Sequence, residues 1–234
     1  MHRSETITLQ KLKSTLGRNG VIPFFNHQNI DCVLEVMRIL KRCDCEVFEF
    51  THQRDARGIR MFAWLADRAQ ELGITMGAGT VLDASQANRY IRAGAKFIAS
   101  PFLHEDVAHT CYNHDVLWIP GCTTLADVLQ AKALGATTVI IIPGNILGPD
   151  FVKQVVAIHP ELTCIPSGGV TLAKNNIQSW FDAGALCVRL GDALFTREDV
   201  AVKDWGKIES NVHDALQGIR QLKSSILSTK SISI

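Results

Sequence analysis

The feature that most constrains the fold is a regular alternation of strand-like and helix-like segments along nearly the whole chain. Eight short hydrophobic runs start 20 to 29 residues apart, at 20–25, 45–51, 74–81, 96–100, 116–120, 138–143, 162–167 and 186–190. That spacing accommodates a strand, a crossover helix and two short loops. Amphipathic segments separate the runs, at 29–42, 56–72, 84–93, 123–134 and 172–183.

The strand-like runs are apolar along most of their length, which is typical of a parallel sheet covered on both faces. Eight such units within 234 residues predict a (β/α)8 barrel, the TIM-barrel fold. An open doubly wound sheet is the alternative, but no GxGxxG motif follows the first run. We expect a single domain over 1–234, an extra helix near 6–16 covering the bottom of the barrel, a closing helix over 205–227, and a frayed tail over 224–234.

Charge and cysteine content narrow the class of protein. The net charge is +1, so nothing indicates nucleic acid or a membrane surface as a partner. No apolar run reaches membrane-spanning length, and the first residues, MHRSETITLQ, lack the hydrophobic segment of a secretory signal. Seven cysteines, an odd number scattered along the chain, predict reduced and mostly buried thiols in a cytoplasmic protein.

In a barrel of this kind, chemistry belongs at the carboxyl ends of the strands. Glycine and proline recur at those ends, including Gly79, Pro101, Gly168, Gly169 and Gly191. Glycine lets the backbone approach a small ligand and expose N–H groups to an anion. Ending a strand explains any one of these residues, but their recurrence favours a ligand pocket.

The second run, CEVFEFT, places an ionisable residue, Glu49, inside an apolar strand. Alternation puts Val47, Glu49 and Thr51 on one face, and Phe48 and Phe50 on the other. If the phenylalanines face the helices, Glu49 points into the barrel mouth, where it could act as a general base or acid. The alternative is a structural carboxylate paired with an arginine. Arg189 in the last run is a candidate partner, although an Arg189 that faces the helices fits the sequence equally well.

Six motifs, in their order and spacing, resemble the 2-keto-3-deoxy-6-phosphogluconate and 4-hydroxy-2-oxoglutarate aldolase family. They are VFEFT, GAGTV, FIASP, IPGCTT, IIPG and PSGGV, and the resemblance covers about residues 18–195. It implies a homotrimeric (β/α)8 barrel that splits a 2-keto-4-hydroxy acid into pyruvate and an aldehyde. It also implies that Glu49 shuttles protons and that Thr80 and Ser167 contact the pyruvyl part. Backbone groups of Gly168 and Gly169 would hold a distal phosphate.

The chain departs from this family pattern at several positions. The lysine that forms an imine with the substrate ketone falls on Ile140, which has no amine. Lys132, Lys153 and Lys174 lie outside that strand. The carboxylate-binding arginine position carries Gln53, followed by Arg54, and Arg189 stands where the family prefers glycine. The phosphate-binding serine position carries Asp192, which opposes a phosphate or alternatively caps the next short helix.

Two functions are predicted, and a purely structural barrel that serves in an assembly is a third, weaker possibility. The first is an aldolase-family carbon–carbon lyase that acts on a 2-keto-3-deoxy or 4-hydroxy-2-keto acid without the lysine imine. Its predicted catalytic residue is Glu49, and its predicted substrate contacts are Gly79, Thr80, Pro101, Ser167, Gly168, Gly169, Arg54, Arg189, Gly191 and Asp192. The second is an inactive or repurposed homologue that binds a keto acid or sugar acid. No cofactor is expected, although a divalent metal held by Glu49, His52 and Asp192 is a weaker possibility.

Overall fold

The computed structural model describes residues 2–52 and 56–231, and for residues 2–8, 56 and 227–231 it describes the backbone only. Eight parallel strands form one sheet in the order β7-β6-β5-β4-β3-β2-β1-β8. They are β1 (Val21–Phe25), β2 (Val47–Thr51), β3 (Thr75–Gly79), β4 (Phe97–Ser100), β5 (Leu117–Cys122), β6 (Thr138–Ile141), β7 (Thr163–Pro166) and β8 (Val188–Leu190). The structure confirms all eight predicted strands.

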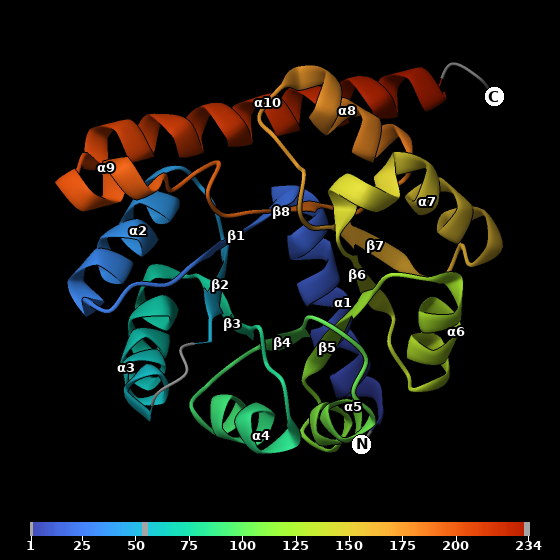
Figure 1. Ribbon diagram of the computed structural model, residues 1–234, viewed down its shortest axis with the longest axis horizontal. Helices are drawn as coiled ribbons and strands as arrows, with labels where there is room; N and C mark the ends of the chain where they lie inside the picture. The colour runs from blue at the N-terminus through green and yellow to red at the C-terminus, as the bar shows by residue number, and fades with distance from the viewer. Residues whose placement is uncertain (1, 53–55, 232–234) are drawn as a thin grey trace.

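The sheet curls into a barrel rather than remaining open. Strand β1 pairs with both β2 and β8, so the first and last strands are neighbours. Between β7 and β8, Ser167 and Arg189 form an isolated parallel bridge, and the Leu186 N–H just before β8 donates to the Cys164 carbonyl of β7 at 2.9 Å. Figure 1 shows the resulting ring of strands with helices around it. The predicted (β/α)8 barrel is therefore confirmed, and the doubly wound sheet is excluded.

The helices follow the strands in the expected alternation. They are α1 (His2–Asn19), α2 (Ile30–Arg42), α3 (Ala56–Leu72), α4 (Ala84–Arg92), α5 (Glu105–Asn113), α6 (Leu125–Ala133), α7 (Gly144–Ile158), α8 (Lys174–Asp182), α9 (Arg197–Val202) and α10 (Trp205–Ser231). The predicted closing helix is α10, which extends to Ser231, and residues 232–234 lie outside the described residues.

Side-chain caps set the starts of several helices. The Asn29 side chain accepts a hydrogen bond from the Asp31 backbone N–H (2.8 Å), and Asp83 accepts one from Gln86 (2.7 Å). Thr124 and Asp127 form a reciprocal capping box at α6. These caps satisfy N–H groups that have no partner in the first turn of a helix.

The core has two layers separated by the strands. An inner cluster fills the barrel with side chains that include Ile22, Val47, Phe97, Ile140 and Ile165. Leu12 and Leu16 of α1 belong to this inner cluster, so the predicted helix at the bottom of the barrel is confirmed (Figure 1). The outer cluster lies between strands and helices and contains Phe48 and Phe50.

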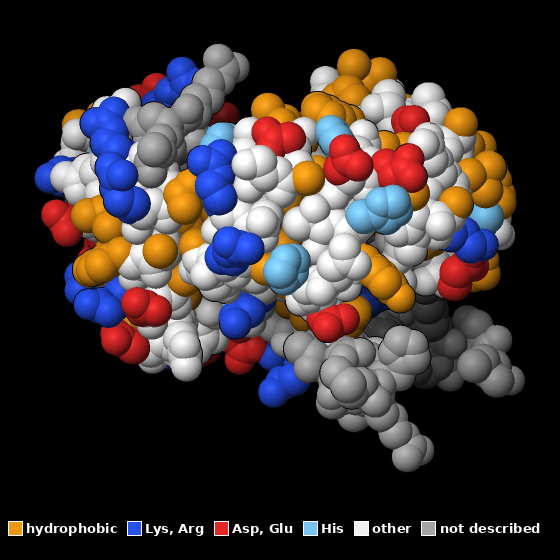
Figure 2. All heavy atoms as spheres, turned by 90° about the horizontal axis from the view of Figure 1, so that it is seen from below, with side chains coloured by type: hydrophobic (Ala, Val, Ile, Leu, Met, Phe, Trp, Pro, Cys, Tyr) orange, Lys and Arg blue, Asp and Glu red, His pale blue; other side chains and the backbone are white. Residues whose placement is uncertain are grey.

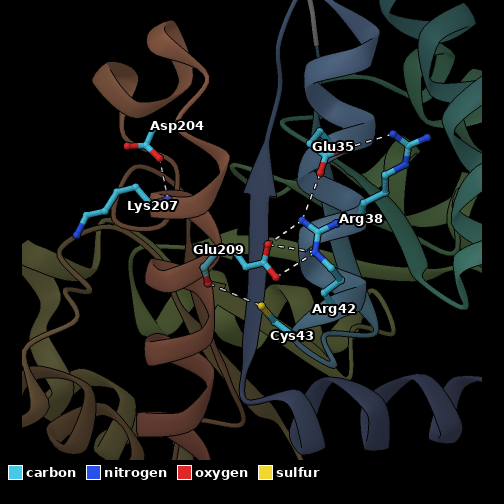
Figure 3. A network of polar contacts seen from close by, with 7 residues as sticks. All are labelled: Glu35, Arg38, Arg42, Cys43, Asp204, Lys207 and Glu209. Atoms are coloured by element: carbon cyan, nitrogen blue, oxygen red, sulfur yellow. Dashed lines mark hydrogen bonds and ion pairs between the residues drawn. The ribbon is translucent and has the colours of Figure 1, made fainter.

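Helix α10 packs against α2, α8 and α9 (Figure 1). A polar network fixes it to α2: Arg42 donates to both carboxylate oxygens of Glu209, at 2.8 to 3.1 Å, and to Glu35 at 3.3 Å (Figure 3). The hydrogen bonds from Arg42 lower the pKa of Glu209. Because these side chains are partly exposed, solvent screening limits such a pair to about 0.2–1 kcal/mol. The network orients α10 more than it stabilises the fold.

All seven cysteines are free and buried, as the sequence predicted. Burial raises the thiol pKa to about 12 at Cys45, Cys111, Cys122, Cys164 and Cys187. Such thiols stay protonated at neutral pH and act as small hydrophobic side chains.

The surface carries charges of both signs. Figure 2 views the molecule from the side on which α4 and α5 lie. Lysine and arginine side chains gather toward the left of this view, histidines lie nearer the centre and right, and acidic side chains occur on both sides. In the described part of the chain, no helix combines the length and apolar character needed to span a membrane.

Candidate active site

Strand β2 delivers Glu49 to the interior of the barrel. Glu49 is 0% exposed, in register with Phe24 of β1 and Gly77 of β3. Phe48 and Phe50 on either side belong to the outer cluster against the helices. The orientation predicted from strand alternation is therefore confirmed: the carboxylate points inward.

Arg189, the middle residue of β8, points at the Glu49 carboxylate. Its Nε donates to Glu49 Oε2 at 2.9 Å, its Nη2 donates to Glu49 Oε1, and its Nη1 donates to Ser167 Oγ at 2.8 Å. Both partners are buried, with Arg189 9% exposed. The alternative in which Arg189 faces the helices is wrong, and the pairing of Glu49 with an arginine is confirmed. Arg189 thus satisfies both carboxylate oxygens through a bidentate pair.

Gly79 makes room for this ion pair. A Cβ atom at Gly79 would overlap the Glu49 carboxylate, with nothing flexible to yield except the paired side chain itself. Gly79 therefore supports Glu49 from β3, the strand beside β2. Its role is close approach to the carboxylate rather than a positive φ angle.

Gly79→Ala is expected to lower the free energy of unfolding by about 1–3 kcal/mol, because the added methyl overpacks the site and forces Glu49 from Arg189. Urea denaturation measures the loss. Gly218→Ala in α10 is the matched control, since a Cβ there meets nothing within 4 Å. That control should raise stability by up to about 1 kcal/mol through helix propensity. Equal stability of Gly79→Ala and wild type would contradict the close-approach role.

A small cavity of about 50 Å³, the inner cavity, lies beside the ion pair. Its lining residues are Thr80, Ala99, Ser100, Pro101, Ile140, Ile142 and Arg189. The predicted contacts Thr80, Pro101 and Arg189 thus lie together with Ile140. The volume is enough for roughly three or four waters, or for the head of a small acid.

Thr80 is in a strained conformation at the edge of the inner cavity. Its φ angle is 56°, in the left-handed region that a β-branched residue rarely adopts. Such strain is commonly found where a side chain is held for function. That Thr80 contacts a ligand stays a prediction.

Strand β6 brings Ile140, not an amine, to the inner cavity. Ile140 is 2% exposed and belongs to the inner cluster. Lys132 is paired with Glu161 on the surface, and Lys174 lines a groove between α8 and α10. Neither of these lysines lines the inner cavity.

The other predicted contacts are divided among different places. Ser167 holds Arg189, whereas Gly168 and Gly169 form a turn with φ angles of 84° and 72°. This turn packs against Asn145 and lines neither the inner cavity nor the larger cavity at Gly191 and Asp192. Arg54 and Gln53 lie outside the described residues. The helix-cap role considered for Asp192 is wrong, because Thr196 caps α9.

The three candidate metal ligands do not converge. Both Glu49 oxygens are bonded to Arg189, and His52 Nδ1 lies 2.8 Å from Tyr90 Oη, toward the helix layer. Burial lowers the pKa of His52. Asp192 is exposed beyond the end of β8. This donor set does not fit a shared divalent ion.

Two contributors to the site were not predicted as site residues. Ser100 lines the inner cavity and accepts a hydrogen bond from Trp118 Nε1 at 2.9 Å. Phe24 supports Arg189, whose Cζ lies 4.8 Å from the ring centre. Both residues lie at the carboxyl ends of predicted strands, and this position is the sequence feature that could have indicated a role at the site.

A model of the family described as KDPG and KHG aldolase matches residues 12–211. The chain belongs to this family. It is 32% identical to the 2-dehydro-3-deoxy-6-phosphogalactonate aldolase of Escherichia coli over 121 residues, which are 51% of this chain and 58% of that protein. It is 25% identical to the 2-dehydro-3-deoxy-phosphogluconate aldolase of Treponema pallidum over 86% of this chain and 94% of that one. The family resemblance predicted from the motifs is confirmed.

Solved structures of the family share the fold. The 4-hydroxy-2-oxoglutarate/2-dehydro-3-deoxyphosphogluconate aldolase from TTHB1 has a TM-score of 0.75 at 23% identity, covering 88% of this chain and 98% of that one. The KDPG aldolase of Legionella pneumophila, with pyruvate captured as a covalent carbinolamine, has a TM-score of 0.78 at 20% identity. That alignment covers 87% of this chain and 97% of the other.

Proposed function

We propose that this protein is an aldolase-family lyase that binds the keto-acid head of a 4-hydroxy-2-keto acid in the inner cavity and cleaves it without forming an imine. Family membership supports lyase chemistry on 2-keto-3-deoxy acids. The single observation that carries the mechanism is that Arg189 lines the inner cavity while it holds Glu49. The cation Arg189 and the proposed proton carrier Glu49 are therefore hydrogen bonded to each other beside the inner cavity.

Substrate binding exchanges one carboxylate for another on Arg189. The guanidinium has five N–H donors and uses three on Glu49 and Ser167. A substrate carboxylate or ketone oxygen that bonds Arg189 from the inner cavity competes with Glu49. Once released from Arg189, the Glu49 carboxylate oxygens are free to accept a proton from the substrate.

The cleavage step needs a base for the C4 hydroxyl and a cation that stabilises the negative charge of the enolate. Glu49 takes the proton of the C4 hydroxyl, the C3–C4 bond breaks, and C4 leaves as an aldehyde. The electron pair forms the enolate of pyruvate, whose oxygen is stabilised by Arg189. Glu49 then returns the proton to C3, which completes pyruvate.

Binding without turnover is the second candidate, and the ion pair favours it. A carboxylate held by two guanidinium N–H bonds is a weak base, and Glu49 does not itself line the inner cavity. If Arg189 keeps Glu49 when a keto acid binds, the protein recognises the acid but does not cleave it.

Pyruvate release from a set of 4-hydroxy-2-keto acids, combined with calorimetry of pyruvate binding, tests both candidates. Glu49→Gln should lower turnover by at least about 10²-fold and leave pyruvate binding measurable. Glu161→Gln, at an exposed glutamate, is the control and should match wild type. Binding without turnover in the wild type would replace the lyase by the second candidate. Failure of every keto acid to bind would exclude both.

A homotrimer in the cytoplasm completes the proposal. Exposed apolar side chains follow consecutive strands on the side of β4, β5 and β6, namely Phe102, Leu125, Leu129 and Ile146. Such a group of side chains favours burial against other copies of the chain. The seven unpaired cysteines favour a reducing compartment.

A further inference from the structure

A second cavity, the outer cavity, opens beyond the ends of β1, β2 and β8. It has a volume of about 440 Å³, within the range of small-molecule sites. Its lining residues are Phe24, Phe25, Asn26, His27, Thr51, Gly191, Asp192, Phe195, Arg197, Val200 and Ala201. The mechanism above uses none of this space, and the inner cavity is too small for more than the head of a substrate.

Phe24 lies between Arg189, which lines the inner cavity, and the outer cavity. Its ring lies under the Arg189 guanidinium, at 4.8 Å from Cζ, and it also lines the outer cavity. Gly191 permits this position, because a Cβ there would overlap the Phe24 ring. A ligand whose head is bound by Arg189 therefore has the outer cavity on the other side of a single aromatic ring.

Thr51 lines the outer cavity on the strand that carries Glu49. It lies two residues after Glu49 on the same face of β2, or about 6.6 Å farther toward the mouth. Its Oγ1 is buried, and no side chain or backbone group of the described residues hydrogen bonds to it. A buried hydroxyl without a partner is costly. A ligand oxygen in the outer cavity would supply the missing hydrogen bond.

The lining of the outer cavity selects an uncharged, flat group. Phe25 and Phe195 pack as a tilted pair with ring centres 5.2 Å apart, which offers further aromatic faces and edges. The formal charges of Asp192 and Arg197 cancel, so the lining offers no net cation to a phosphate. Apolar and aromatic contact is the main source of affinity that remains.

We propose that the outer cavity binds an uncharged aromatic group on C4 of the substrate, with Thr51 bonded to the C4 oxygen. This inference rests on the proposed function and names its substrate class: 4-aryl-4-hydroxy-2-keto acids. Cleavage of the C3–C4 bond then yields an aromatic aldehyde and pyruvate, with the proton movements given above.

Calorimetry with 4-phenyl-2-oxobutanoate, which lacks the C4 hydroxyl and cannot be cleaved, tests the site directly. It should bind at least about tenfold more tightly than pyruvate, because the phenyl group buries apolar surface. Ala201→Trp fills the cavity from an exposed position and should remove this advantage while pyruvate affinity stays unchanged. Ile158→Trp, at an exposed position of α7, is the matched control and should behave as wild type.

Thr51→Val separates the hydroxyl contact from the aromatic contact. It should weaken binding of 4-hydroxy-4-phenyl-2-oxobutanoate about tenfold and leave 4-phenyl-2-oxobutanoate unaffected. Equal affinity for pyruvate and 4-phenyl-2-oxobutanoate would overturn the aromatic site and leave the proposed function standing. Tighter binding of a phosphate-bearing keto acid than of the phenyl compound would also overturn it. Absence of pyruvate binding would instead count against the proposed function.

Discussion

Arg189→Met is expected to lower the free energy of unfolding by about 3–5 kcal/mol, because it leaves Glu49 buried without its cation. The methionine replaces much of the apolar stem but none of the three hydrogen bonds to Glu49 and Ser167. Urea denaturation at neutral pH measures the change. This is the largest single effect on stability that the structure predicts, since the charged partner is 0% exposed.

The double variant Glu49→Leu with Arg189→Met distinguishes a lost ion pair from lost packing. Replacing both members of a buried pair by apolar groups is often neutral or stabilising by about 1–4 kcal/mol. We therefore expect the double variant to recover most of the stability that Arg189→Met loses. A loss in the double variant as large as that in the single variant would show that packing around Phe24 and Gly79, rather than uncompensated charge, holds the site together.

Ile140→Lys combined with Arg189→Gly is expected to form an imine with pyruvate and to raise retro-aldol turnover by at least about 10²-fold. Burial disfavours the charged form of the new amine, which leaves it free to attack a ketone. Removing Arg189 eliminates a neighbouring cation, enlarges the inner cavity and frees both Glu49 oxygens. The single variant Ile140→Lys should gain much less retro-aldol turnover, because Arg189 still holds both oxygens of the Glu49 carboxylate.

Borohydride reduction in the presence of pyruvate, followed by peptide mass analysis, locates the imine. The adduct should appear on the peptide that contains position 140 in the double variant and be absent from the wild type. Ile158→Lys adds an amine at an exposed position and serves as the control. Preferential trapping on any lysine of the wild type would overturn the conclusion that this chain does without the imine.

The sequence predicted the barrel and the direction of Glu49 because both depend on local periodicity. Alternation along β2 needs only the two phenylalanines beside Glu49 to identify the face toward the helices. The spacing of the hydrophobic runs likewise predicted all eight strands.

Features that depend on long-range pairing could not be predicted in the same way. Strand β8 has three residues, too few for alternation to show which way Arg189 points. Its direction is decided by Glu49, which is 140 residues earlier in the chain, and by the Phe24 ring. His52, a candidate metal ligand from the sequence, instead lies 2.8 Å from Tyr90 of α4, a partner 38 residues farther along the chain. The N-cap of α9 is Thr196 rather than Asp192, because Thr196 directly precedes the helix.

The junction between β7 and β8, where the barrel closes, lies next to the side chain that we propose binds the ligand. Ser167 and Arg189 form the isolated backbone bridge between β7 and β8, and their side chains are hydrogen bonded to each other. A molecule that draws the guanidinium away from Ser167 removes a side-chain hydrogen bond beside this bridge. We therefore expect ligand binding to change amide protection along the junction of β7 and β8, which hydrogen exchange would measure.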